Sequence, residues 1–269
     1  MYGLFCYMKK QNLYILITFV ITLWLQFGCA GDTTPQTSRV SIDPKEIAAA
    51  NLDADKLFTQ REDLSKLRQA ISVLAKVRNP DNRDYEVEWK FAKYNYFFGL
   101  HTKDEKEADA AFTNGRDAAK IASNIEQQKP DGHFWYGANL GELCKRSPIT
   151  VGLQSVGDVQ DALKRVIEMQ PRYQGASAYD GLAQIELGTR LKGGSVEKAV
   201  EYLEKAVSIE DDNTNLHLHL AEAYLAQKND AAAKKRLEIL LKMKPNPDFI
   251  PEYNASVKAA RKLLETKFQ

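Results

Sequence analysis

Histidine and cysteine, the side chains that most often bind transition metals or act as nucleophiles, are scarce in this chain. Its 269 residues include three cysteines and four histidines, the latter at positions 101, 133, 217 and 219. HExxH, CxxC, GxSxG and GxGxxG motifs and a Walker loop are all absent. His217 and His219 point to different faces of a helix because they are two residues apart, so they make a poor metal pair. We therefore expect no catalytic residue, no metal site and no cofactor, and hence no enzyme.

An excess of charge of one sign is also missing. The chain has 37 basic and 36 acidic residues, a formal net charge of +1, and no basic stripe. Proteins that bind nucleic acid usually carry a basic face, so this balance argues against a nucleic-acid partner. The composition, 44% hydrophobic and 27% charged, is that of a chain that buries a core.

A hydrophobic run long enough for a typical membrane span, about 20 residues, is lacking as well. The apolar stretch at residues 13–25 follows two lysines and precedes "QFGCAGD", which is the order of an export signal. Cys29 resembles the lipidated cysteine of a bacterial lipobox, although Gln26 occupies the position of the usual leucine. Residues 1–29 are thus predicted to be a signal peptide with lipidation at Cys29. The alternatives are an uncleaved anchor and a secreted protein without lipid.

The residues that follow the predicted signal peptide fit a tether. Residues 30–44, "AGDTTPQTSRVSIDP", are polar and show no helical or strand period. With Cys29 carrying lipid, Cys144 would be the one free thiol, so the fold cannot depend on an internal disulfide. These features predict a protein held by lipid at the periplasmic face of a bacterial membrane. Ala30, rather than aspartate, after the cysteine slightly favours the outer membrane.

Strand signals are scarce over residues 45–269, where helical periods and repeats predominate. The clearest repeat is "LAEAYLAQKNDAAAKKRLEILLKMKP", which has seven residues at the spacings of a tetratricopeptide repeat. These residues are Leu220, Ala221, Tyr224, Ala233, Leu237, Leu240 and Pro245. Weaker copies such as "VEKAVEYLEKAVSIEDD" lie upstream. We predict an all-α fold, a tetratricopeptide-like superhelix of four to five helix pairs, closed by a C-terminal capping helix from about residue 251 to 268.

The stretch "DGHFWYGANLGELCKRSP", residues 131–148, fits the first helix of the third pair. Trp135, Asn139, Glu142 and Arg146 recur at spacings of 4, 3 and 4 and form a stripe of one aromatic and three hydrogen-bonding groups. Because first helices of such pairs line the concave surface, this stripe is a candidate binding surface. The alternative is that its three polar residues bond to neighbouring helices. Cys144, on an apolar face, is expected to be a small buried hydrophobe rather than a nucleophile.

The preceding helix, "YEVEWKFAKYNYFFGL", carries more aromatic side chains than one helix seam requires. Seven of its sixteen residues are aromatic, Trp89 and Tyr96 among them. A wide internal core would explain this density. An apolar cavity or a contact between copies in a homo-oligomer would also explain it. Trp89 and Tyr96 are therefore added to the candidate residues for binding a ligand or partner.

Together, the lipobox-like cysteine, the degenerate repeats over about residues 50–265 and the sequence "PDGHFWYGANLGELCKRSP" are similar to a known family. The chain resembles the T component (TatT-like proteins) of tripartite ATP-independent periplasmic (TRAP) transporters. Residues 134–142 are the part that carries this signature. The resemblance implies an all-helical periplasmic lipoprotein that works with a periplasmic solute-binding receptor and an ion-driven permease. It implies no catalytic role for any residue.

Two functions are therefore expected from the sequence. In the first, the scaffold binds a solute receptor, an apolar small-molecule ligand, or both, as an accessory component of a TRAP-type transporter. In the second, a generic tetratricopeptide lipoprotein binds peptides and assists envelope or outer-membrane protein assembly. A groove dominated by lysine, arginine and asparagine would favour the second function, and an aromatic groove favours the first.

Overall fold

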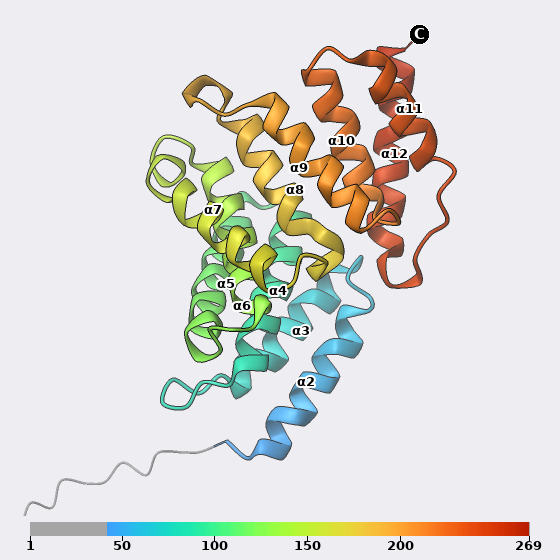
Figure 1. Ribbon diagram of the computed structural model, residues 1–269. Helices are drawn as coiled ribbons and strands as arrows, with labels where there is room; N and C mark the ends of the chain where they lie inside the picture. The colour runs from blue at the N-terminus through green and yellow to red at the C-terminus, as the bar shows by residue number, and fades with distance from the viewer. Residues whose placement is uncertain (1–41, 269) are drawn as a thin grey trace, which may run out of the picture. The chain divides into compact units, whose positions relative to one another are not determined.

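Helices account for all the regular secondary structure in the part of the chain that the structure describes. The computed structural model describes residues 42–268, which form eleven α-helices and two short 3-10 helices and no strand (Figure 1). The predicted signal peptide, Cys29 and residues 30–41 of the predicted tether lie outside the described residues. Within residues 42–268, no helix is both long enough and apolar enough to cross a bilayer.

Ten of these helices follow one another as five pairs. The pairs are α2 (Pro44–Phe58) with α3 (Leu64–Val77), α4 (Tyr85–His101) with α5 (Glu105–Ile125), α6 (Pro130–Arg146) with α7 (Val151–Met169), α8 (Tyr173–Gly188) with α9 (Val196–Ile209), and α10 (Thr214–Ala226) with α11 (Asp230–Leu240). The 3-10 helices are η1 (Arg190–Lys192) and η2 (Pro247–Phe249), and the last helix is α12 (Ile250–Lys267). The predicted all-α fold of helical hairpins with a C-terminal capping helix is confirmed.

Short polar side chains fix where most of the helices begin. A side-chain oxygen at the residue before the helix accepts a hydrogen bond from a backbone N–H of the first turn, which otherwise has no partner. The residues that do this are Asp43, Asp63, Asp84, Asp104, Ser195, Asn213 and Asn229. Helix α6 begins instead with Pro130, whose ring already holds the helical φ angle.

The repeat unit identified in the sequence packs as its spacing predicts. Ala221 of α10 and Ala233 of α11 have no exposed surface, and their small side chains let the two helices approach closely. Leu237 and Leu240 are also fully buried, and they join α12 residues such as Ala260 in one hydrophobic cluster. The small residues at the crossing therefore set the geometry of this pair.

First helices of successive pairs form the inner layer of the stack. Helix α4 contacts α2 and α6, α8 contacts α6 and α10, and α10 also contacts α12. The second helices, α3, α5, α7, α9 and α11, each pack on the first helix of their own pair, so they form the outer layer. Side chains of α4, α6, α8 and α10 that face away from the second helices and from their neighbours are consequently directed to one shared surface.

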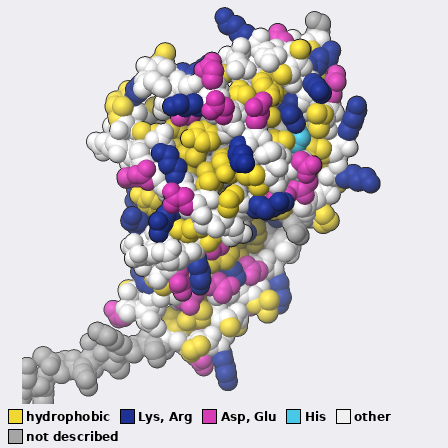
Figure 2. All heavy atoms as spheres, viewed as in Figure 1, with side chains coloured by type: hydrophobic (Ala, Val, Ile, Leu, Met, Phe, Trp, Pro, Cys, Tyr) yellow, Lys and Arg dark blue, Asp and Glu magenta, His cyan; other side chains and the backbone are white. Residues whose placement is uncertain are grey.

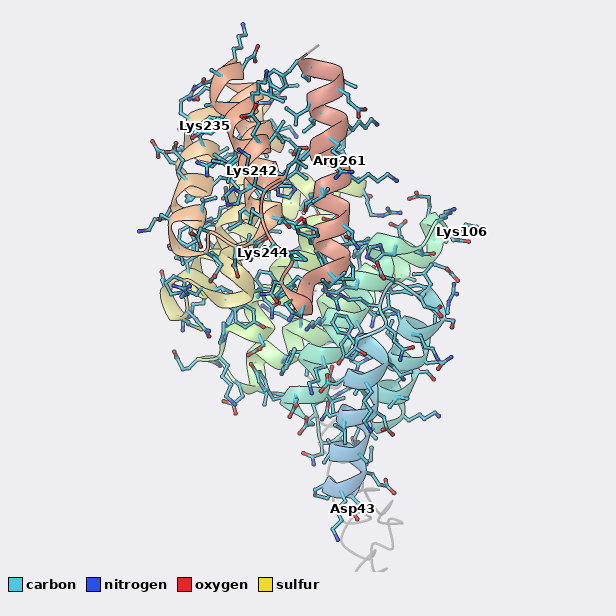
Figure 3. The ribbon with its side chains drawn as sticks, turned by 90° about the vertical axis from the view of Figure 1, so that its right-hand side faces the viewer. Asp43, Lys106, Lys235, Lys242, Lys244 and Arg261 are labelled. Atoms are coloured by element: carbon cyan, nitrogen blue, oxygen red, sulfur yellow. The ribbon has the colours of Figure 1, made fainter. Side chains whose placement is uncertain are left out.

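Helix α12 closes the stack at its C-terminal end. Its Ala260 is buried against α10 and α11, whereas Arg261 is exposed, as are Lys235 and Lys244 nearby (Figure 3). A polar outer face of this kind is what a terminal capping helix needs. At its other end α12 reaches back to the loop between α2 and α3, where Arg61 forms two hydrogen bonds to the carboxylate of Glu252, at 3.0 and 2.7 Å.

Candidate ligand-binding groove

A groove of about 1350 Å³ lies on the surface shared by the first helices. Its walls come from α4, α6, α8 and α10, with contributions from α7, the segment around η1 and the first turns of α12. On the face shown in Figure 2, hydrophobic side chains gather over α7 and α8 and are surrounded by charged ones. We call this space the groove; its volume exceeds the usual 300–1000 Å³ of a small-molecule site.

One wall of the groove is a cluster of aromatic rings from α4 and α6. The centroid of the Trp135 ring lies 5.6 Å from that of Tyr96, 6.2 Å from that of Phe97 and 4.9 Å from that of Phe134. These separations and tilted or edge-on angles are those of favourable aromatic pairs. All four rings line the groove. We call Tyr96, Phe97, Phe134 and Trp135 the aromatic wall.

Local packing in the first turns of α6 holds this wall in place. The Asp131 carboxylate accepts hydrogen bonds from the hydroxyl groups of Tyr85 and Tyr173, both at 2.7 Å. A side chain at Gly132 would lie 2.4 Å from the backbone nitrogen of Ser123, so only glycine lets α6 approach α5 this closely. The "PDG" of the sequence therefore anchors α6 to its neighbours.

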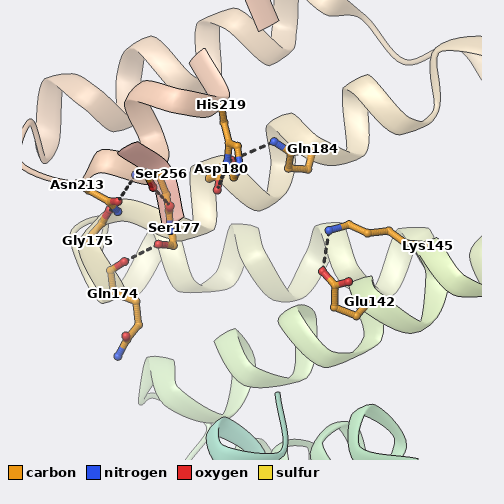
Figure 4. A network of polar contacts seen from close by, with 11 residues as sticks. Glu142, Lys145, Gln174, Gly175, Ser177, Asp180, Gln184, Asn213, His219 and Ser256 are labelled. Carbon is orange, nitrogen blue, oxygen red and sulfur yellow. Dashed lines mark hydrogen bonds and ion pairs between the residues drawn. The ribbon is translucent and has the colours of Figure 1, made fainter. Parts of the chain in front are cut away.

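Polar side chains form the opposite side of the groove, on α8 and α10 (Figure 4). The Nδ1 atom of His219 lies 2.8 and 2.9 Å from the two carboxylate oxygens of Asp180, so Nδ1 carries a proton and donates. Gln184 also donates to Asp180, at 3.4 Å. Burial lowers the pKa of His219 and the Asp180 carboxylate raises it, and the net effect is a pKa above the ordinary value.

A second charged pair lies on α6, beside the aromatic wall. The Lys145 ammonium donates to the Glu142 carboxylate at 2.7 Å, and both residues line the groove. Burial, followed by the charges of Glu142 and Asp180, raises the pKa of the Tyr96 phenol, which places that phenol near both carboxylates. The aromatic wall and the polar side are therefore within electrostatic reach of each other.

The start of α8, at one end of the groove, has an unusual backbone. Gln174, Gly175 and Ala176 have φ angles of 49°, 62° and 60°, in the left-handed region. We call residues 174–176 the left-handed turn. Asn213 donates to the carbonyl of Gly175 at 2.8 Å, and Ser177 donates to that of Gln174 at 2.6 Å (Figure 4). A Cβ at Gly175 would also lie 2.9 Å from Asn213 Nδ2, so this position requires glycine.

Three of the six residues proposed from sequence as binding residues line the groove. Tyr96 and Trp135 belong to the aromatic wall, and Glu142 lies beside it. Trp135 is only 2% exposed, so it supports the wall more than it offers surface. Trp89 is partly buried against the core of the first pairs and is not part of the groove lining.

Asn139 and Arg146 lie elsewhere than the binding stripe placed them. Asn139 has no exposed surface, and its amide donates to the carbonyls of Trp135 at 2.7 Å and Ala92 at 3.3 Å. Arg146 forms ion pairs with Glu105 and Asp109 of α5. At 100° per residue, Asn139 lies about 40° and Arg146 about 20° around the helix from Trp135, on the side of the neighbouring helices, whereas Glu142 lies about 20° to the other side. The contacts of Asn139 and Arg146 are those of the alternative interpretation, in which polar residues of the stripe bond to neighbouring helices.

The remaining candidates for chemistry have structural surroundings. Cys144 is half-buried, and burial followed by the charge of Asp158 raises the pKa of its thiol, as expected for an unreactive cysteine. His133 contacts the carbonyl oxygen of Gln127 at 3.1 Å. Burial lowers the pKa of His133, despite this hydrogen bond. Within residues 42–268, no three histidine, cysteine or acidic side chains are grouped so as to bind a metal.

Sequence reasoning missed the pair of Asp180 and His219. Both residues lie in mostly apolar segments, "ASAYDGLAQI" and "LHLHLAEAYL", and a charged group on the inner face of a helix is a signal that could have been used. The sequence does not reveal that they meet, because they lie 39 residues apart on different helices.

Comparison with known proteins agrees with the architecture. A family model described as tetratricopeptide repeat matches residues 190–260. A second model, described as regulator of microtubule dynamics protein 1-3, matches residues 52–182. The chain has a tetratricopeptide-like helical-repeat fold. No curated protein matches it.

A solved structure shows the same fold for this tetratricopeptide-like chain. A thermophilic tetratricopeptide protein of Thermus thermophilus, TTC0263, superposes with a TM-score of 0.55 at 18% identity, over 77% of this chain and 99% of the other. MamA gives a TM-score of 0.46 at 17% identity, over 79% of this chain and 96% of its own. At 18% identity the likeness to TTC0263 concerns the fold alone.

Proposed function

We propose that this chain is a lipid-anchored helical scaffold that holds an apolar ligand in the groove and works beside a periplasmic solute receptor, as an accessory component of a TRAP-type transporter. The observation that carries the proposal is the groove itself, about 1350 Å³ in volume and walled on one side by four aromatic rings. Preformed concave sites with aromatic walls and few polar groups are typical of small-molecule binding.

Exposed apolar side chains along the groove support a role in interaction. Leu100, Leu153, Leu191 and Phe249 all line it, and each exposes more than two fifths of its surface. Apolar side chains that gather on a protein surface usually mark a ligand or partner site, because exposing them to water is unfavourable. A solute receptor docking along this edge would cover them.

The transporter part of the proposal is supported by the sequence that builds the aromatic wall. Phe134 and Trp135 belong to the stretch that resembles the T component of TRAP transporters. A lipid on Cys29 would hold the scaffold beside the membrane and raise the local concentration of ligand near a permease. No bond is made or broken in this function, and the absence of enzymatic activity stays a prediction.

Peptide binding by a generic scaffold, the second function, has less support from the groove. Such binding would use free asparagine side chains as clamps on an extended peptide. Here Asn213 donates to Gly175 and also accepts from the backbone of Asn215, whose own side chain accepts from Ser256. These asparagines are engaged in holding α8, α10 and α12 together, so an apolar ligand is favoured over an extended peptide.

A blocked groove tests the proposal directly. Ala138 of α6 lines the groove, whereas Ala110 is exposed on α5 and is not part of the lining. We expect Ala138→Trp to fill the groove and Ala110→Trp, the matched control, to leave it open. Tagged, lipidated protein would be purified from gently solubilised membranes, and both co-purifying proteins and solvent-extracted small molecules would be identified by mass spectrometry.

Three results would decide the matter. Recovery of a solute receptor or permease, with apolar molecules lost only in Ala138→Trp, supports the proposal. Recovery of outer-membrane assembly proteins in place of transporter subunits contradicts the transporter role. Equal amounts of extracted ligand in both variants would show that the groove is not the ligand site.

A further inference from the structure

Charge is unevenly distributed along the helical stack. Residues 42–225 carry 24 basic and 30 acidic side chains, a net charge of −6. Residues 226–268, which contain α11 and α12, carry ten basic and five acidic side chains, a net charge of +5. The near-zero charge of the whole chain conceals this difference between its body and its C-terminal end.

The positive charges at the C-terminal end are exposed and unpaired. None of the ten basic side chains forms an ion pair with an acidic side chain of residues 42–268. Repulsion among such charges is unfavourable, and an anionic partner would relieve it. The nine exposed ones are Lys228, Lys234, Lys235, Lys242, Lys244, Lys258, Arg261, Lys262 and Lys267.

Helix α12 presents three of these cations together. Lys258, Arg261 and Lys262 lie within about 100° of one another around the helix. They line one shallow hollow of about 400 Å³ on its outer side, together with Glu265. One carboxylate therefore faces three cations there, so the outer side of α12 keeps an excess of positive charge.

Helix α11 and the loop after it extend the same surface. Lys235 and Lys242 are seven residues apart, which is two turns with a rotation of only about 20°. Figure 3 shows Lys235, Lys242, Lys244 and Arg261 on the side of the molecule that α11 and α12 form. The sequence shows no basic stripe because these residues come from two helices and a loop, which only the fold brings together. We call Lys235, Lys242, Lys244, Lys258, Arg261 and Lys262 the basic face.

The composition of the basic face favours a lipid surface over a protein partner. Eight of the nine exposed cations are lysines and one is an arginine. Protein interfaces are enriched in arginine, whose planar group binds carboxylates in a fixed geometry, and are depleted in lysine. Lysine clusters on a helix beside a membrane are typical of binding to anionic headgroups, where mobile point charges suffice.

We propose that the basic face rests on an anionic phospholipid surface. The exposed ammonium groups contact lipid phosphates, and this contact fixes which side of the helical stack faces the bilayer. The choice of a membrane as partner rests on the proposed function, because the proposed lipid on Cys29 keeps the chain beside a bilayer. The groove has no part in this inference.

The position of α12 lets its basic residues reach the bilayer that would hold Cys29. Residues 30–43 separate Cys29 from α2 and span at most about 50 Å when fully extended. Helix α2 is about 22 Å long, and the turns from Glu252 to Lys258 add about 9 Å. The hydrogen bonds of Arg61 to Glu252 hold the end of α2 beside the start of α12. The tether is thus longer than the two helical segments together.

The test measures vesicle binding without the anchor. The mature chain carrying Cys29→Ser would be sedimented with vesicles of phosphatidylcholine alone and with vesicles that contain phosphatidylglycerol. In 50 mM salt we expect at least about tenfold tighter binding to the anionic vesicles, since each cation near such a surface contributes roughly fivefold. In 500 mM salt the preference should disappear, because salt screens exposed charges.

A triple variant and a matched control locate the contact. Lys258→Gln, Arg261→Gln and Lys262→Gln together should weaken binding to the anionic vesicles at least about tenfold. Lys103→Gln, Lys164→Gln and Arg165→Gln remove the same charges from exposed positions outside α11 and α12, and binding should stay within about twofold of the wild type. All six side chains are exposed, so both variants should keep the helical circular dichroism.

The other outcomes would overturn the inference. Equal binding to both kinds of vesicle excludes the headgroup contact, while the lipid anchor and the groove of the proposed function stay untouched. Equal loss in the two triple variants would mean that net charge, and not the basic face, governs binding. Displacement from the vesicles by poly-glutamate at the same charge concentration would assign the face to an acidic protein instead.

Discussion

The ion pair between Arg61 and Glu252 joins the beginning of the helical stack to its last helix, and breaking it should be costly. The Arg61 residue is 7% exposed and lies over the rings of Phe58 and Phe97, 5.1 and 5.8 Å from their centroids. Two hydrogen bonds at 3.0 and 2.7 Å connect it to Glu252, whose side chain is 20% exposed. Replacing Glu252 would remove a carboxylate that forms two hydrogen bonds with this buried cation.

The expected cost of Glu252→Gln follows from this burial. Removing one partner of a buried pair costs about 3–5 kcal/mol, and the partial exposure of Glu252 lets water recover some of it, so we expect the free energy of unfolding to fall by about 2–3 kcal/mol. The double variant Arg61→Met with Glu252→Gln removes the buried cation as well and should regain at least half of that loss. Urea unfolding followed by circular dichroism measures all members of the cycle.

An exposed pair provides the control for this experiment. Arg68 and Glu107 are 2.7 Å apart with side chains 53% and 43% exposed, and Glu107→Gln should cost less than about 1 kcal/mol. The reasoning is refuted if Glu252→Gln costs no more than this control, or if the double variant is as unstable as the single one. Hydrogen exchange should place the loosening in the first turns of α12.

Three further predictions concern stability and reactivity. Burial and the Arg61 charge lower the pKa of Lys93 to about 8, so the unfolded state binds more protons than the folded state between about pH 8 and 10. The free energy of unfolding of the wild type, compared with that of Lys93→Met, should therefore rise with pH in this window, by at most about 1.4 kcal/mol per pH unit. Gly132→Ala should destabilise the protein by several kcal/mol in urea unfolding. Gly157→Ala should stabilise it by about 0.5–1 kcal/mol, because a Cβ at residue 157 meets nothing within 4 Å. Similar effects of the two substitutions would contradict the packing of α6 on α5. Cys144 should react with a thiol reagent at least tenfold more slowly in the native state than in urea, as mass spectrometry of the labelled peptide can show. Equal rates would mean that the thiol is not buried and that its pKa is not raised.

The sequence predicted the fold well because the fold depends on local spacing. Ala221, Ala233 and Leu237 lie at distances that one hairpin imposes, and that hairpin needs no information from the rest of the chain. Helix starts were equally accessible, since caps such as Asp104 and Asn213 act within one turn. The capping helix α12 could be predicted for the same reason.

The groove was only partly predictable, because it depends on how helices face one another. Helical spacing placed Trp135 and Asn139 on one stripe, yet a rotation of about 40° separates the groove wall from the contact between helices. Whether Asp180 and His219 meet in the groove depends on the register between α8 and α10. Asn213, just before α10, donates to the left-handed turn at the start of α8, and no local pattern in the sequence indicates that turn.

The left-handed turn lies where two hydrophobic cores meet. Tyr173, just before it, belongs to the core of the first three pairs, and Ala176, its last residue, belongs to the core of α8, α9 and α10. A left-handed conformation costs roughly 1–2 kcal/mol at each residue other than glycine, so relaxing Gln174 and Ala176 would release energy. That strain is offset where the two cores join, by the burial of Tyr173 and Ala176 and by the hydrogen bond from Asn213 to the Gly175 carbonyl.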